Sequence, residues 1–332
     1  AGLVPTLTEG LFGGVIAQGS QLARPQWVML RGPLMAPPWA RTVTGRLMWA
    51  FISFTAMLII VLVYAVSAIA LSEAKRSSIA QMSRDALKAA REVPSFFHTG
   101  QGFISEFAAD EQVRSADPVI RQAGLLGALR TGPFFDQLLI YDNNGQQYDQ
   151  YPPEDVAPAT EEERVLIERT LLTRAPQMSV VYAVKGQSLI SFVAPLGDQT
   201  GEQQGVLLGR TRLQVNPFIE RLRESLQNTL GEGIGYLVDE NSLIVVHRDT
   251  NLILSSWSLD LKLKPTLITA EGGTAYEDRF ADGKPRLLFV QPAAGTNWLV
   301  VIELPITSVL NLALQISTPL LLLLLIIGLL AG

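Results

Sequence analysis

The sequence predicts an α+β protein in which two tandem modules, each an antiparallel sheet with flanking helices, stand between two transmembrane helices. Three observations indicate this fold. Two apolar runs without any charged residue, 47–72 and 304–332, lie toward the two ends of the 332-residue chain. The residues between the runs have the charge content of an ordinary globular domain. Within that domain, short sequence motifs occur twice at the same spacing.

Each apolar run is long enough to cross a bilayer, which takes roughly 20 apolar residues in a helix. We therefore predict transmembrane helices at 47–72 and 306–332, the second of them truncated, with an output domain after Gly332. Before the first run stand four arginines and one glutamate: Arg24, Arg31, Arg41, Arg46 and Glu9. Because positive charge favours the cytoplasmic side, we expect a cytoplasmic N-terminus and residues 73–303 outside the cytoplasm of a bacterial inner membrane.

Composition excludes several classes of function. The net charge of −5 and the absence of a basic stripe argue against binding to nucleic acid. The chain has no cysteine, so it has neither disulfides nor thiolate metal sites, and its two histidines are His98 and His247. We find no catalytic triad, metal cluster or phosphate-binding loop. The sequence therefore predicts a protein that is not an enzyme and that needs no metal or cofactor.

The segments around the first apolar run carry two open questions. Residues 1–46 contain several prolines together with tryptophan and arginine, so they form either a cytoplasmic tail or a segment that lies along a bilayer or a neighbouring subunit. After the membrane, residues 73–133 are expected to form long helices. Apolar residues recur there at spacings of three and four, up to a predicted helix end at Pro94: Ile79, Met82, Ala86, Ala89 and Val93. This seam contacts either a second copy or its own domain.

An internal repeat divides the middle of the chain. Residues 139–145 (LIYDNNG) correspond to 236–242 (YLVDENS), and 192–195 (FVAP) correspond to 289–292 (FVQP), both at an offset of 97 residues. In each copy an apolar strand meets a turn of Asp, Asn, Gly or Ser, and an antiparallel hairpin completes the unit. This predicts a membrane-distal module at 134–215 and a membrane-proximal module at 232–305.

A linker helix is predicted between the modules, over residues 216–231. Asn216 is the expected N-cap and Pro217 occupies the first helical turn, where its missing N–H costs nothing. Gly231 is the expected end of the helix.

Three segments carry a resemblance to a known family: 191–213 (SFVAPLGDQTGEQQGVLLGRTRL), 236–249 (YLVDENSLIVVHRD) and 285–306 (PRLLFVQPAAGTNWLVVIELPI). Together with the long helix that precedes them, they resemble the double Cache domain, a tandem PAS-like sensor of bacterial membrane receptors, over residues 73–306. The resemblance implies that small molecules bind in the distal module and that a signal passes to the cytoplasm. The subset of this family that binds amino acids has an arginine followed by aromatic residues. Here Ala175 and Pro176 follow Arg174 instead.

The candidate ligand-binding residues are aromatic and cationic side chains on or beside the strands of the distal module. Aromatic walls with arginine donors suit a small anionic ligand such as a carboxylate. The candidates are Tyr141, Tyr148, Tyr151, Arg174, Tyr182, Phe192 and Arg210.

Two functional hypotheses follow from these features. The first is a membrane-anchored sensor that binds a small molecule outside the cytoplasm. The alternative is a structural subunit of a larger membrane complex that reuses a Cache-type domain, with polar side chains of the second helix bonding to a neighbour. A distal cavity filled by the protein's own side chains favours the alternative. The expected partners are the ligand, the bilayer, and a second copy or other membrane subunits.

Overall fold

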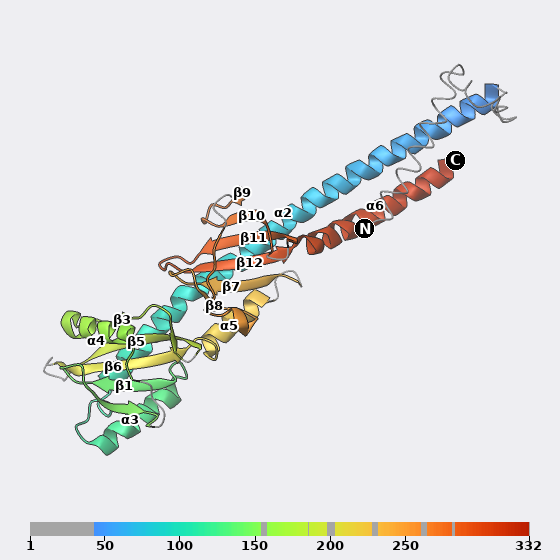
Figure 1. Ribbon diagram of the computed structural model, residues 1–332. Coiled ribbons are helices and arrows are strands. Elements are labelled where there is room, and N and C mark those ends of the chain that lie inside the picture. The colour runs from blue at the N-terminus through green and yellow to red at the C-terminus, as the bar shows by residue number, and fades with distance from the viewer. Residues whose placement is uncertain are drawn as a thin grey trace. The chain divides into compact units, whose positions relative to one another are not determined.

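A computed structural model describes residues 43–153, 158–184, 186–197, 203–227, 232–259, 264–280 and 283–331 (Figure 1). The chain divides into two compact units, one made of Ala1–Glu73 with Leu312–Gly332, the other of Ala74–Asn311. The predicted segment 1–46 lies almost wholly outside the described residues.

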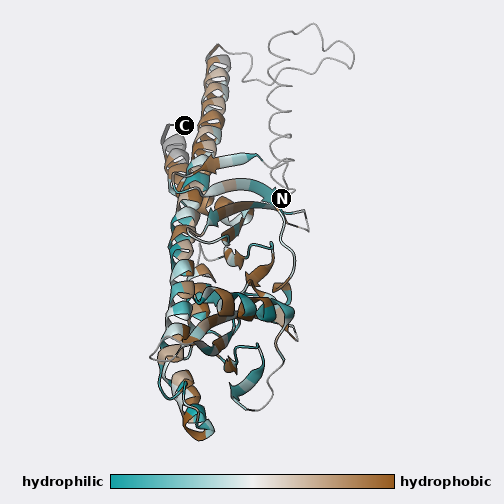
Figure 2. Cartoon of the chain, turned by 90° about the vertical axis from the view of Figure 1, so that its left-hand side faces the viewer, coloured by the Kyte–Doolittle hydropathy of each residue, from teal (hydrophilic) through white to brown (hydrophobic). Residues whose placement is uncertain are grey.

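The first unit contains the apolar parts of two helices, α2 (Val43–Ala109) and α6 (Ile306–Ala331). By length and composition both helices could cross a membrane. Large apolar side chains on them are exposed, for example Phe54 and Leu323, and Figure 2 shows hydrophobic residues along the N-terminal part of α2. In water such a surface is unfavourable, whereas lipid would cover it.

Helix α2 continues through Pro94 to Ala109, so the predicted helix end at this proline is wrong. The residues that follow, including Phe96 and Ile104, are buried within the second unit. Burial of this apolar face outweighs the backbone hydrogen bond that the proline cannot make. The predicted seam from Ile79 to Val93 is also buried, within this single chain.

The distal module is an antiparallel sheet in the order β2-β1-β6-β5-β3, with β4 also paired to β5. Helix α3 (Pro118–Thr131) precedes the sheet, and helix α4 (Glu161–Thr173) lies between its strands in sequence. The strands are β1 (Gln137–Tyr141), β2 (Gln147–Tyr151), β3 (Gln177–Met178), β4 (Tyr182–Val184), β5 (Gln187–Gly197) and β6 (Gln203–Arg212).

The proximal module is a second antiparallel sheet, in the order β8-β7-β12-β11-β10-β9. It follows helix α5 (Pro217–Gln227), whose first turn is capped by the Asn216 side chain. A short 3-10 helix, η3 (Thr250–Leu252), precedes β9. The strands are β7 (Ile234–Val238), β8 (Ile244–Val246), β9 (Pro265–Ile268), β10 (Thr274–Arg279), β11 (Pro285–Pro292) and β12 (Leu299–Pro305).

The turns after β1 and β7 match hydrogen bond for hydrogen bond. The Asp142 amide donates to Gln146 O at 2.9 Å, and the Asp239 amide donates to Leu243 O at the same distance. Each aspartate also accepts two backbone N–H groups of its own turn. Gly145 and its counterpart Ser242 have positive φ angles of 73° and 60°. The repeat seen in the sequence is therefore a repeat of backbone geometry.

The two faces of the distal sheet have different cores. On one face, Leu139, Val193 and Leu208 pack with Leu166 and Ile167 of α4. On the other face an aromatic cluster includes Phe192, Phe134 and, from α2, Phe96. A Cβ atom on Gly100 of α2 would lie 2.6 Å from the Phe192 ring, so only glycine permits this close approach.

Candidate functional site

A groove of about 570 Å³ lies in the distal module between α4 and the end of β1. Its strand side carries Tyr141 and three amide side chains, and its helix side carries apolar residues with two charged ones. These residues include Asn143, Asn144, Gln147, Ile167, Leu171, Arg164 and Glu168. The groove therefore combines an apolar wall with neutral and charged polar groups, as sites for small polar molecules do.

Tyr141 lies at the inner wall of this groove. Because side chains alternate along β1, Tyr141 points to the same face as Leu139, toward α4. The residue is 2 % exposed, and its hydroxyl has no hydrogen-bond partner among the described residues. Burial, and then the charge of Glu163, raise the pKa of Tyr141 to about 12, so the hydroxyl stays protonated at neutral pH. A buried donor without a partner is costly, and a ligand in the groove could supply the missing acceptor.

A buried ion pair lies beside this tyrosine. Arg210 of β6 donates from Nε to Glu163 Oε1 and from Nη2 to Glu163 Oε2, both at 2.7 Å. The two side chains are 3 % and 0 % exposed. This is the bidentate geometry in which a guanidinium binds a carboxylate most strongly.

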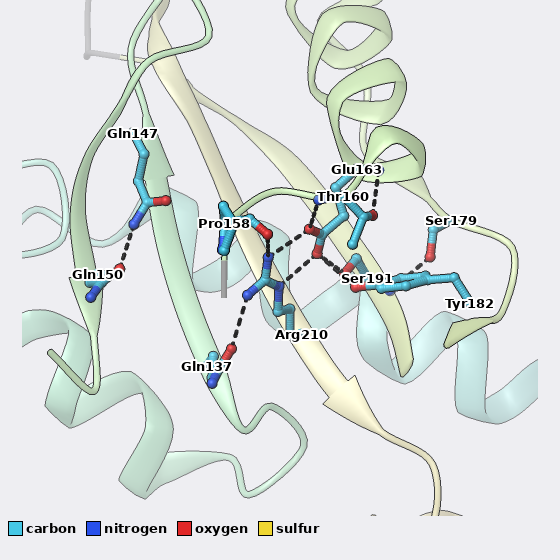
Figure 3. A network of polar contacts seen from close by, with 10 residues as sticks. All are labelled: Gln137, Gln147, Gln150, Pro158, Thr160, Glu163, Ser179, Tyr182, Ser191 and Arg210. Carbon is cyan, nitrogen blue, oxygen red and sulfur yellow. Dashed lines mark hydrogen bonds and ion pairs between the residues drawn. The ribbon is translucent and has the colours of Figure 1, made fainter. Parts of the chain in front are cut away.

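Further donors complete the coordination of the Glu163 carboxylate (Figure 3). The Tyr182 hydroxyl donates to Oε1 at 2.7 Å, and the Ser191 hydroxyl donates to the same oxygen at 2.8 Å. The Thr160 amide donates to Oε2 at 3.0 Å. Two further guanidinium N–H groups of Arg210 donate to Gln137 Oε1 and Pro158 O, both at 3.2 Å. Every strong acceptor position of this carboxylate is therefore in use.

Local sequence explains why Glu163 faces inward. Thr160 caps α4, and its side chain accepts from the Glu163 amide while the Glu163 carboxylate accepts from the Thr160 amide, which is a capping box. Glu163 also lies three, four and seven residues before Leu166, Ile167 and Thr170, all buried. It thus occupies the buried stripe of the helix.

The electrostatics of the pair favour its ionised form. Burial raises the pKa of Glu163, but the hydrogen bond and charge of Arg210 act against it, and the net pKa lies below the ordinary value of 4.5. Burial lowers the pKa of Arg210, whereas Glu163 raises it, with a net upward shift. Burial and the neighbouring Glu163 also raise the pKa of Tyr182, which therefore remains a hydrogen-bond donor.

The structure brings three of the seven candidate residues together. Tyr182 and Arg210 share Glu163, and Tyr141 lies close enough for both members of the ion pair to affect its pKa. Sequence reasoning missed Glu163 as a site residue, because an acidic first turn of a helix is usually solvated. The sequence did contain a signal for it, because Glu163 has the same helical spacing as the buried residues of α4.

The other four candidates lie elsewhere. Phe192 is fully buried on the opposite face of the sheet, against α2. Tyr148 of β2 is 48 % exposed, with the Arg121 guanidinium 5.1 Å from its ring centre. Tyr151 ends β2 and is half-buried, and the exposed Arg174 caps the C-terminus of α4. None of these four residues forms part of the groove wall.

The proximal module contains a comparable polar cluster. The Tyr236 hydroxyl donates to Glu303 Oε1 and accepts from Trp257 Nε1, the latter at 2.8 Å. Arg286 contacts Glu303 at 2.6 Å and Asp278 at 2.6 Å. The described residues of the whole chain contain no group of three or more histidine, aspartate or glutamate side chains that could hold a metal ion.

Comparisons with known proteins identify the architecture. The ligand-binding domain of the Pseudomonas aeruginosa PAO1 chemoreceptor PctB, solved with L-Arg, has a TM-score of 0.54 and 19 % identity, and the match covers 73 % of this chain and 93 % of that domain. The ligand-binding domain of the Pseudomonas fluorescens chemoreceptor CtaA, solved with L-leucine, has a TM-score of 0.51 and 20 % identity, and the match covers 72 % of this chain and 99 % of that domain. The ligand-binding domain of the P. aeruginosa PAO1 chemoreceptor PctC, solved with GABA, has a TM-score of 0.50 and 17 % identity, and the match covers 67 % of this chain and 97 % of that domain.

These similarities define the class of fold. The two sheets with their flanking helices share the fold of these chemoreceptor ligand-binding domains, the tandem Cache architecture that the sequence resemblance predicted. The three solved structures are ligand-binding domains of receptors, not enzymes. No protein-family model matches the chain, and no curated protein sequence matches it.

Proposed function

We propose that this chain is a membrane-anchored sensor that binds a small polar molecule in the groove beside Tyr141. The observation that carries the proposal is the buried Tyr141 hydroxyl, which lacks a partner among the described residues and belongs to a side chain in the wall of a groove of ligand size. The rim adds one cation and one anion, Arg164 and Glu168, one helical turn apart on α4. The ligands bound in the similar structures, L-Arg, L-leucine and GABA, also carry both charges.

Binding of a metabolite panel by the full chain in lipid nanodiscs tests this proposal. A true ligand raises the unfolding temperature of the wild type, and Tyr141→Phe removes most of that shift because only the hydroxyl is lost. Leu172→Ala, at the outer rim of the same groove, is the matched control and should keep the shift. The proposal is wrong if ligands of the wild type stabilise Tyr141→Phe equally well.

The proposed topology has a cytoplasmic N-terminus and residues 73–303 outside the cytoplasm. Its support is the excess of arginine before the first apolar run. Because the chain has no cysteine, a single Val119→Cys substitution gives a clean reporter on an exposed position of α3. A membrane-impermeant maleimide should label this cysteine in spheroplasts. Labelling only after lysis would mean that residues 73–303 lie in the cytoplasm, opposite to the proposed topology.

A structural subunit of a membrane complex is the second candidate. The specific support is the Glu163–Arg210 pair, in which the protein's own carboxylate saturates the guanidinium that a ligand would otherwise use. Native purification followed by mass spectrometry separates the two candidates. Stoichiometric membrane subunits without a bound small molecule favour the subunit, and a bound small molecule without such partners favours the sensor.

A further inference from the structure

Arg210 presents a complete carboxylate-binding arrangement in the interior of the distal module. Its guanidinium meets a carboxylate through two parallel N–H···O bonds, and the hydroxyls of Tyr182 and Ser191 converge on one of the same oxygens. We infer that Arg210 is a carboxylate-binding site that the chain fills with its own ligand, Glu163. This inference goes beyond the proposed function and does not depend on the groove binding anything.

The donors belong to the sheet, whereas the acceptor comes from outside it. Arg210, Ser191 and Tyr182 lie on β6, β5 and β4, and four of the five hydrogen bonds to the carboxylate come from these three side chains. The cross-strand neighbours of Arg210 are Gln137 and Ser191, both neutral. The sheet therefore offers no anion of its own at this position, and α4 brings one to it.

Burial makes this arrangement costly without an anion. A guanidinium that is 3 % exposed has lost its water, and an unpaired charge in such a place is strongly destabilising. Any small carboxylate that reached Arg210 would gain the same four bonds. Glu163 has the advantage of being tethered, since an intramolecular ligand acts at a high effective concentration. The wild-type site is therefore closed to diffusible carboxylates.

The tether has a consequence for α4. The carboxylate belongs to the first turn of the helix, so binding it at Arg210 holds this turn against the sheet next to the groove. The distal module thus keeps a carboxylate-bound arrangement permanently. A ligand in the groove would meet Arg164 rather than Arg210 as its available cation.

Chemical rescue tests the inference directly. Glu163→Ala keeps Cβ and removes the atoms of one acetate ion, so free acetate can refill the site. We expect the unfolding temperature of the full chain in nanodiscs to fall by about 10 °C. Sodium acetate at about 100 mM should restore half of this loss or more, in a saturable way. Acetamide, which has the same shape without the charge, and sodium chloride at equal ionic strength should not.

Two controls separate a site from a general salt effect. Glu161→Ala removes a carboxylate from the same turn of α4, but this side chain is 79 % exposed, so acetate should not change its unfolding temperature. Acetate should not stabilise the wild type either. If Glu163→Ala does not fold unaided, its refolding yield with acetate is compared with the yield with acetamide.

Equal effects of acetate on Glu163→Ala and on the wild type would overturn the inference, as would equal refolding yields in acetate and acetamide. This result is distinguishable from failure of the proposed function. The rescue depends on Arg210 and Glu163, whereas the ligand screen depends on the Tyr141 hydroxyl, so either experiment can fail while the other succeeds.

Discussion

The two modules share a backbone plan but carry opposite charges at the same position of the sheet. In the distal module Arg210 stands between Gln137 and Ser191 on the neighbouring strands. In the proximal module the corresponding position, between Ile234 and Leu288, belongs to Glu303. Each charge is paired, and a tyrosine hydroxyl contacts the carboxylate of each pair. Both modules therefore have an ion pair at this position, but the strand residue is the cation in the distal module and the anion in the proximal one.

The origin of the partner differs between the modules. Glu163 comes from helix α4 and is fully buried with Arg210. Arg286 lies on β11, the strand next to that of Glu303, and this pair is 18 % and 11 % exposed. The distal pair therefore joins a helix to the sheet, whereas the proximal pair stays within the sheet and nearer to water. Similar chemistry thus has a larger structural role in the distal module.

The comparison predicts its largest effect for the two arginines. Arg210→Met leaves the Glu163 carboxylate buried without a cation and should cost about 3–5 kcal/mol of unfolding free energy. Arg286→Met leaves a partly hydrated Glu303 and should cost about 1–2 kcal/mol. Urea unfolding of each variant in nanodiscs, followed by tryptophan fluorescence, measures both. Equal losses would show that the two pairs are structurally equivalent.

A double substitution should recover part of the larger loss. When Glu163→Gln is combined with Arg210→Met, no buried charge remains, while the amide oxygen introduced at position 163 can still cap α4. We expect this variant to lie about 1–2 kcal/mol below the wild type, and so above Arg210→Met alone. Losses of the two single substitutions that simply add in the double variant would argue against direct coupling of the residues.

Acid should weaken the distal pair in a defined window. The pKa of Glu163 in the folded protein lies below its ordinary value of 4.5. The pair therefore contributes its full stability above pH 4.5, and this contribution disappears as the pH falls toward the folded-state pKa. The difference in unfolding free energy between the wild type and Glu163→Gln, measured from about pH 6 to about pH 3, should shrink below this value. A constant difference would mean that Glu163 does not titrate with unfolding.

The sequence predicted the fold to a large extent and the site only in part. The Asp-Asn turns and the 97-residue offset reproduce in the backbone because local turn chemistry determines them. The helix end predicted at Pro94 was wrong because residues beyond it, such as Phe96 and Ile104, are buried against parts of the chain that are distant in sequence. Arg210 and Tyr182 were identified by residue type, but their pairing with Glu163 depends on where α4 lies on the sheet. Such contacts between distant segments leave no periodic signal.

The smallest expected effect concerns the hydroxyl that distinguishes the two modules. At the position of Tyr141 the proximal repeat has Val238, which is fully buried and apolar. Tyr141→Phe removes a buried hydroxyl that has no partner among the described residues, so it should raise the unfolding free energy by about 0.5–1 kcal/mol without ligand. A polar group kept at the expense of stability is typical of a binding site. Urea unfolding of this variant without added ligand measures the gain. If the unfolding free energy instead fell by more than about 1 kcal/mol, the hydroxyl would form a hydrogen bond within the protein. The groove would then lack the unpaired polar group that distinguishes it from the packed face around Val238.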